Sequence, residues 1–175
     1  MNIIVGLDDS DTSKIIIDFV CSLELYENTN FRLIHVENPI MVNEHPLIAY
    51  APFLEPAQNE YVLQARDLVI SSAKRLHEKI SAHNNNNNNN VNINADVLIG
   101  LPTTILVQQA KEWPADLIVV GSHSRSGIEQ LLLGSVSREI VAQSPCSVMV
   151  VKIGKHALSK PPCTEAQIDV SLSTG

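Results

Sequence analysis

The sequence predicts an α/β fold in which one parallel β-sheet lies between two layers of helices. Short apolar runs typical of buried strands alternate with stretches whose apolar residues recur at helical spacing, in the order βαβαβαβαβ. Strands separated by helices favour parallel pairing, because each crossover helix returns the chain to the same end of the sheet. The chain has 175 residues, of which 45% are hydrophobic, and this is enough for a single domain with a substantial core.

The N-terminal third supplies two strands, a helix and a long loop. The first strand is expected at Asn2–Leu7, and a polar turn follows at residues 8–12. Apolar residues recur every three or four positions over residues 13–25, and this spacing predicts the first helix. The second strand is expected at residues 31–36. A long, proline-containing loop then occupies residues 37–56.

A long helix and an asparagine-rich insertion occupy the middle of the chain. The helix is expected over residues 57–82, because its apolar residues fall on one face. Those residues are Val62, Ala65, Val69, Ala73, Leu76 and Ile80. Seven consecutive asparagines at residues 84–90 are interpreted as a disordered insertion, since such a run has no apolar surface to offset its ordering entropy.

Three strands and two helices are expected in the rest of the chain. Proline is favoured in the first turn of a helix, so Pro102 is expected to begin the third helix. The expected positions are residues 91–99, 116–120 and 147–153 for the strands, and residues 102–113 and 136–141 for the helices. Residues 1–153 then form the domain. Residues 154–175, which are polar and contain two prolines, form a flexible tail.

Charge and composition exclude several classes of function. The formal net charge is −7, so the chain lacks the basic surface that non-specific binding to nucleic acid or to an anionic membrane needs. No apolar run approaches the roughly 20 residues that span a bilayer. The three cysteines show neither CxxC nor ligand spacing, which indicates reduced thiols and a cytoplasmic protein. No GxSxG, HExxH or GxxxxGK[ST] motif is present, so no dedicated catalytic site is expected.

The most informative stretch is GSHSRSGIEQLLLGSVS, from Gly121 to Ser137, between the fourth strand and the fourth helix. A helix N-terminus leaves backbone N–H groups without partners and carries a partial positive charge, and a phosphate satisfies both. Glycines let the backbone approach such a ligand closely. In a parallel sheet, ligands bind beyond the carboxyl ends of the strands, so the turn at residues 8–12 is expected to flank the same crevice. A phosphate-bearing ligand such as a nucleotide is therefore the first functional hypothesis.

Four segments together resemble the universal stress proteins, a family of small α/β domains related to the adenine-nucleotide α-hydrolase-like folds. The resemblance covers roughly residues 1–153. Three of the segments are IIVGLDDS at residues 3–10, LIHV at residues 33–36 and a Gly-x-Pro turn at residues 100–102. The fourth, at residues 121–135, is similar to the family's ATP-binding signature, which reads Gly, two residues, Gly, nine residues, then Gly-Ser or Gly-Thr.

The resemblance implies a Rossmann-like, HUP-type αβα sandwich of three layers with sheet order 3-2-1-4-5. It also implies bound ATP together with Mg²⁺, whose protein ligands are left unassigned. The residue matching Asp8 then lies by the ribose, and the backbone of the residue matching Val36 meets the adenine. The positions around the phosphates are Gly121, Gly134, Ser135, Val136 and Ser137. Many members of the family form homodimers through the last strand, which here runs from Ser147 to Ile153.

Ser124 stands where the signature has its second glycine. If that position needs a left-handed backbone, a side chain there costs roughly 1–2 kcal/mol. A serine hydroxyl can instead donate to a phosphate oxygen, so Ser124 stays among the candidate nucleotide-binding residues. Three interpretations therefore remain open. They are an ATP-binding regulatory switch protein that acts as a homodimer, a nucleotide-free dimeric interaction or chaperone-like module that has lost the phosphate site, and a weak ATPase.

Several residues also have ordinary structural interpretations. Ser135 is either a phosphate contact or the N-cap of a helix, and the acidic turn around Asp8 either contacts a ligand or caps the first helix. His35 lies on a strand and is expected to be packed or hydrogen-bonded. Cys21 and Cys146 are expected to be small core residues.

Overall fold

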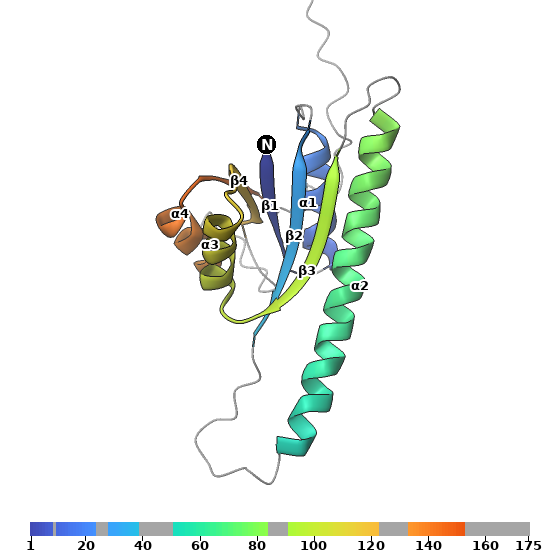
Figure 1. Ribbon diagram of the computed structural model, residues 1–175, viewed down its shortest axis with the longest axis vertical. Helices are drawn as coiled ribbons and strands as arrows, with labels where there is room; N and C mark the ends of the chain where they lie inside the picture. The colour runs from blue at the N-terminus through green and yellow to red at the C-terminus, as the bar shows by residue number, and fades with distance from the viewer. Residues whose placement is uncertain (9, 24–27, 39–50, 84–90, 123–132, 153–175) are drawn as a thin grey trace, which may run out of the picture.

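The computed structural model describes residues 1–8, 10–23, 28–38, 51–83, 91–122 and 133–152. Within these residues the chain forms one five-stranded sheet in the order β3-β2-β1-β4-β5, and every neighbouring pair of strands is parallel. Figure 1 shows the strands side by side, with the long helix α2 along one flank. The α/β class and the sheet order 3-2-1-4-5 are thus confirmed. Ser124, the asparagine run and the tail lie outside the described residues.

The elements follow the predicted alternation of strands and helices. The strands are β1 (Asn2–Leu7), β2 (Asn30–Glu37), β3 (Asn92–Ile99), β4 (Leu117–Gly121) and β5 (Ser147–Val151). The helices are α1 (Ser10–Cys21), α2 (Ala51–His83), α3 (Pro102–Glu112) and α4 (Ser135–Gln143). No helix in the described part of the chain is both long enough and apolar enough to cross a membrane.

Two helices, α1 and α2, begin at least three residues earlier than expected, and α1 ends at Cys21 rather than at residue 25. Helix α1 begins at Ser10 rather than at residue 13, because serine, aspartate and threonine suit the first turn of a helix as well as they suit a free turn. Helix α2 begins at Ala51, so the end of the expected loop at residues 37–56 is helical. Proline suggested a loop there. However, Pro52 occupies the second helical position, where the backbone N–H has no partner within the helix.

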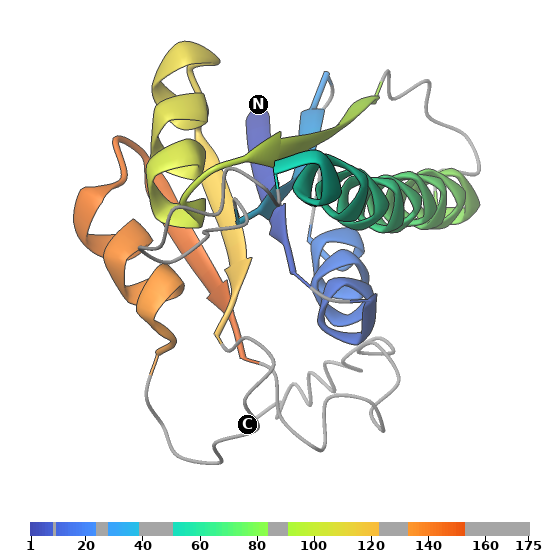
Figure 2. The same ribbon diagram turned by 90° about the horizontal axis from the view of Figure 1, so that it is seen from below.

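Each face of the sheet carries its own core. Helices α1 and α2 cover one face, and α3 and α4 cover the other, as the end-on view in Figure 2 shows. Alternate residues of β1 divide between the two faces: Ile3 and Val5 join the first core, and Ile4 joins the second. The central strands are therefore apolar on both faces, as a parallel sheet between two layers of helices requires.

An asparagine ladder sets the register at the amino ends of three strands. Asn2 pairs with Asn30 and Asn30 with Asn92 in the sheet. The side chain of Asn30 donates through Nδ2 to Oδ1 of Asn2 at 2.9 Å, and Nδ2 of Asn92 donates to Oδ1 of Asn30 at 3.0 Å. These bonds tie the starts of β1, β2 and β3 together. They lie at the end of the sheet away from the carboxyl ends of the strands.

Candidate functional site

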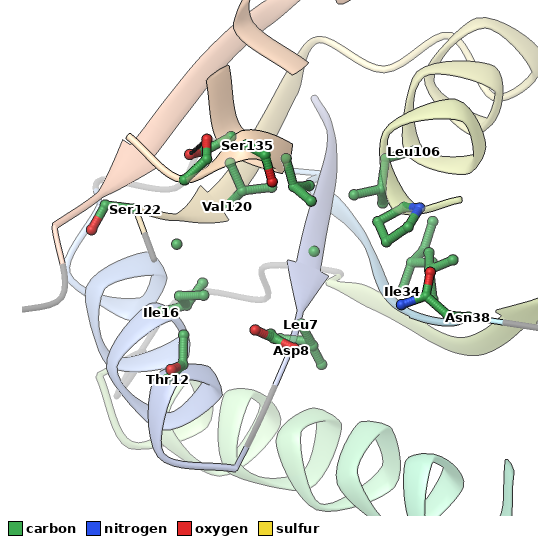
Figure 3. A pocket seen from close by; sticks show the side chains of 17 residues that line it. Leu7, Asp8, Thr12, Ile16, Ile34, Asn38, Leu106, Val120, Ser122 and Ser135 are labelled. Atoms are coloured by element: carbon green, nitrogen blue, oxygen red, sulfur yellow. Dashed lines mark hydrogen bonds between the residues drawn. The ribbon is translucent and has the colours of Figure 1, made fainter. Parts of the chain in front are cut away.

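A pocket of about 190 Å³ lies at the carboxyl ends of the central strands. The strand ends contribute Leu7 from β1, Val36 from β2 and Gly121 from β4 (Figure 3). The sheet opens here because β1 pairs with β4 only as far as Val5, whereas it stays in register with β2 as far as Leu7. This is the switch point of a doubly wound sheet, the usual place for a ligand crevice in such folds.

The floor of the pocket needs a glycine. A Cβ added to Gly6 would lie 3.0 Å from Cγ1 of Val120 and 3.2 Å from Cδ1 of Leu106. Both neighbours belong to the second core, so a side chain at this position would displace packed residues of β4 and α3. Gly6 itself lines the pocket, and its missing side chain leaves space there.

One end of the pocket is polar and is built around the start of α4. Gly134 is the N-cap of this helix, with φ −56° and ψ 160°, and no side chain caps the helix. The N–H of Gly134 donates to the carbonyl oxygen of Ser122 at 2.8 Å, and its carbonyl oxygen accepts the N–H of Arg138 at 3.0 Å. The next three residues, Ser135, Val136 and Ser137, line the pocket. Their N–H groups belong to the first turn and have no partner within the helix.

Ser135 is therefore not the N-cap of α4, because Gly134 holds that position. The interpretation of Ser135 as an ordinary capping serine is wrong. The hydroxyl of Ser137 is also directed locally, since its Oγ donates to the carbonyl oxygen of Gly134 at 3.1 Å. What this end of the pocket presents to a ligand is mainly the backbone of the first helical turn.

The opposite end of the pocket is apolar. Ile34 and Val36 of β2 face Leu106 of α3, and all three are buried. Figure 3 shows this group on the side of the pocket away from Ser122 and Ser135, with Asn38 as its polar member. Such a pocket accepts a ligand with an apolar, ring-like part at one end and an anionic part at the other.

Gly100 shapes the turn that carries α3 to this apolar end. Its φ of 153° lies in a region that residues with side chains rarely adopt, and an added Cβ would lie 2.8 Å from Cγ1 of Ile105. The helix then begins at Pro102, which lines the pocket, and no side chain caps it. The turn therefore requires a glycine at residue 100, both for its backbone conformation and for the packing of Ile105 against it.

Asp8 is the one charged side chain among the described residues that line the pocket. It is half-buried and follows directly on β1, and Figure 3 places it near Leu7 and across from Thr12 of α1. No lysine or arginine is among these lining residues. An anion in this pocket therefore depends on the backbone of helix N-termini, with their partial positive charge, and not on a cationic side chain.

Mg²⁺ fits this set of donors only together with a ligand. Within the described residues, no group of three or more histidine, cysteine, aspartate or glutamate side chains converges to hold a metal ion. Mg²⁺ is usually bound by one or two carboxylates plus substrate phosphates. Asp8 supplies one carboxylate at the edge of the pocket, so it is the residue that would share such an ion with a phosphate.

The structure brings most of the predicted site residues to one place. Those that line the pocket are Asp8, Val36, Gly121, Gly134, Ser135, Val136 and Ser137. Ser124 lies outside the described residues. Sequence reasoning missed Thr12 and Ile16, which lie four positions apart and so on one face of α1, and it also missed Ser122, Asn38 and Leu106. Ile34 lies in the second predicted strand and Leu106 in the third predicted helix, and their place in the pocket appears only once β2 and α3 are packed together.

His35 and two cysteines lie where the sequence placed them. His35 is buried and both of its ring nitrogens are hydrogen-bonded, as expected. Cys21 packs against the first core and Cys146 against the second. Burial raises the pKa of the Cys21 thiol to about 11.

Comparison with known proteins identifies the family. The model of the universal stress protein family matches residues 1–152. The chain belongs to the universal stress protein family. It is 27% identical to universal stress protein YxiE of Bacillus subtilis over 155 residues, which cover 85% of this chain and 97% of that protein. It is 36% identical to universal stress protein A homolog 2 of Coxiella burnetii over 91 residues, 52% of this chain but only 59% of that protein.

Solved structures share the fold of this universal stress protein. Protein MJ0577, a universal stress protein of Methanocaldococcus jannaschii, superposes with a TM-score of 0.70 at 22% identity, covering 87% of this chain and 96% of its own. A universal stress protein in complex with cAMP gives a TM-score of 0.56 at 24% identity, with coverage of 87% and 96%. A family protein of Arabidopsis thaliana with AMP bound gives 0.60 at 16% identity, with coverage of 93% and 97%.

Proposed function

We propose that this universal stress protein is a regulatory protein that binds an adenine nucleotide, ATP, and changes state with it. The observation that carries this proposal is the polarity of the pocket. One end is an apolar slot between β2 and α3, and the other is the uncapped first turn of α4. An adenine ring suits the slot, and phosphates suit the helix N-terminus. Two proteins of the same fold, with cAMP and with AMP, are in keeping with this choice of ligand class.

Each predicted site residue has a place in this proposal. The backbone of Val36 meets the adenine at the end of β2, and Asp8 at the end of β1 accepts from a ribose hydroxyl. The phosphates lie against the polar end of the pocket, where Mg²⁺ would offset part of their charge, with Asp8 as the carboxylate available to hold it. The residues around them are Gly121, Ser124, Gly134, Ser135, Val136 and Ser137.

We assign the site a role in binding rather than in fast catalysis. Phosphoryl-transfer enzymes stabilise the charge of the transition state with lysine, arginine or metal ions held by several ligands. Among the described lining residues Asp8 is the only charged group. A bound triphosphate is therefore held and hydrolysed slowly at most. Contacts that form only with the γ-phosphate present would provide the two states of a switch. Most of the signature loop, residues 123–132, lies outside the described residues.

We further propose that the protein forms a homodimer through β5 and works in the cytoplasm. Strand β5 pairs with β4 on one side, and it is the last strand of the sheet in the described part of the chain. Its edge therefore presents unpaired backbone groups to a second copy of the chain. The middle residues Val148, Met149 and Val150 are partly exposed and apolar, which suits such pairing.

The deciding experiment is the release of small molecules from purified, denatured protein, followed by chromatography and mass analysis. ATP or ADP is expected in the released fraction of the wild type and absent from that of a Gly134→Val variant prepared in parallel. If the wild-type protein releases no nucleotide and also shows no thermal shift with Mg-ATP, the alternative is favoured, in which the protein is a nucleotide-free interaction module. Phosphate release above the background of the Gly134→Val variant would favour the weak ATPase.

A further inference from the structure

A buried histidine joins the ends of β1 and β2 beside the pocket. His35 is 5% exposed and lies opposite Leu7 in the sheet. Its Nδ1 is 3.1 Å from the carbonyl oxygen of Leu7, and its Nε2 is 2.9 Å from Oε2 of Glu37. The imidazole therefore bridges the backbone of one strand and a side chain of the next.

The contact with Leu7 assigns a hydrogen to one ring nitrogen of His35. The carbonyl oxygen of Leu7 can only accept, so Nδ1 of His35 carries a hydrogen and donates it. On the other side of the ring, Nε2 of His35 lies against Oε2 of Glu37. Glu37 thus holds the ring in the orientation that presents Nδ1–H to Leu7.

The bond to Leu7 holds a strand end that lacks support on its other side. Beyond Val5, β1 has no register with β4, and this separation opens the pocket. Leu7 is the last residue of β1, and it is a buried member of the first core. The side chain of His35 therefore adds a second tie between β2 and the last residue of β1, beside the pairing of Leu7 with His35 in the sheet.

Asp8 is the next residue in the chain, and it is the charged group of the pocket. We propose that His35, held by Glu37, is a positioning residue that sets the end of β1 and so places the Asp8 carboxylate against a ribose hydroxyl of the nucleotide. This inference rests on the proposed nucleotide site. It adds a pair of residues that do not touch the ligand and act on it only through the backbone of Leu7 and the side chain of Asp8.

The test is a double-mutant cycle between His35 and Asp8, measured by calorimetric titration with AMP. His35→Leu removes the donor, and we expect AMP affinity to fall about tenfold, as for one lost hydrogen bond. His35→Asn keeps an N–H donor at about the position of Nδ1, so its affinity should stay within about threefold of wild type. Asp8→Ala alone should weaken binding, and the double variant His35→Leu with Asp8→Ala should be no weaker than Asp8→Ala. The proposal would be overturned if the losses of AMP affinity from His35→Leu and Asp8→Ala add up in the double variant. It would also be overturned if His35→Leu and His35→Asn lost the same affinity.

A second measurement needs no ligand. In ¹H–¹⁵N NMR spectra, His35→Leu should shift the backbone amide of Asp8, and His35→Asn should leave it close to its wild-type position. His77→Leu, at an exposed histidine of α2, is the matched control and should leave the Asp8 amide at its wild-type position. If His35→Leu also leaves the Asp8 amide in place, the positioning role is wrong even though nucleotide binding stands. If wild-type protein binds neither ATP nor AMP, the proposed function fails, and the ribose contact fails with it; the spectra then decide the placement of Asp8 alone.

Discussion

Gly134 and Ser122 are joined by a backbone hydrogen bond of 2.8 Å that links the end of β4 to the start of α4. Both residues line the pocket. The bond uses the N–H of the N-cap residue, so the first-turn donors that remain for a ligand are those of Ser135, Val136 and Ser137. It also sets the direction of α4 relative to the sheet. The polar end of the pocket is therefore shaped by backbone geometry. We expect substitutions at Gly134 to weaken ligand binding more than they disturb the fold.

Replacing Gly134 with valine should weaken ATP binding on the order of 100-fold while leaving the fold intact. The φ of Gly134 is −56°, which any residue adopts, so the effect would come from side-chain bulk beside the phosphates and not from backbone strain. Affinity is measured by calorimetric titration, and folding by far-ultraviolet circular dichroism. Gly134→Ala is the matched comparison, because it adds a single methyl group and no hydroxyl that could cap the first-turn N–H groups. If the valine variant binds ATP as tightly as the wild type, the phosphates do not bind beside Gly134.

Replacing Ser124 with glycine should tighten ATP binding about fivefold to thirtyfold. This is the gain expected if the position adopts a left-handed backbone, where a side chain costs roughly 1–2 kcal/mol. The same titration measures it, with the wild-type chain as the reference. A weaker complex would show that the serine hydroxyl is itself a ligand of the phosphates, and the serine would then be a variation of the signature rather than a defect in it.

Asp18 ties α1 to α2, and its contribution to stability should depend on pH. Arg75 donates to its two carboxylate oxygens from Nε and Nη2, each at 2.8 Å, and Nζ of Lys79 lies 3.3 Å from Oδ1. Partial burial raises the pKa of Asp18, but the hydrogen bonds and charges of Arg75 and Lys79 outweigh this and leave the pKa below its usual value. The pair therefore stabilises the fold above the usual pKa near 4, and this contribution is lost as pH falls through the lowered folded-state value.

Asp18→Asn should accordingly lower the free energy of unfolding at pH 7 by about 0.5–1 kcal/mol, a modest figure because both partners are about 40% exposed. The difference from wild type should shrink towards zero near pH 3. Urea unfolding at both pH values measures this. Asp67→Asn, at an exposed position of α2, is the control and should have little effect. A difference that persists unchanged at pH 3 would mean that Asp18 stabilises the helix pair by packing instead.

Cys21 should resist alkylation in the folded protein. With a pKa of about 11, roughly one thiol in a thousand is ionised at pH 8, and the thiolate is the species that reacts. Labelling of Cys21 by iodoacetamide should be slower than in urea-unfolded chain by on the order of 100-fold. Peptide mass mapping after a timed reaction checks this, and Cys163, which the sequence assigns to the tail, provides an internal comparison. Equal rates in folded and unfolded protein would show that Cys21 is not held in the core.

Local patterns predicted the elements well where periodicity was strong and less well where composition was ambiguous. The spacing of Ala65, Val69 and Leu76 identified the buried face of α2, and all three are buried. The starts of α1 and α2 were misplaced, because serine, aspartate and proline are common both in turns and in the first turn of a helix. Sequence periodicity does not separate those two uses, since the difference lies in what the segment packs against.

The sequence by itself determined the alternation of strands and helices, the buried faces and the glycine-bearing turn before α4. These depend on residues close together in the chain, so their signals are local. Only the tertiary structure decided that Asp8, Val36 and Gly134 share one pocket, that Ile34 and Leu106 form its apolar end, and that His35 supports the end of β1. The physical reason is that these contacts join strands distant in the chain. They exist only after the sheet has opened between β1 and β4 and the helices have packed on both faces.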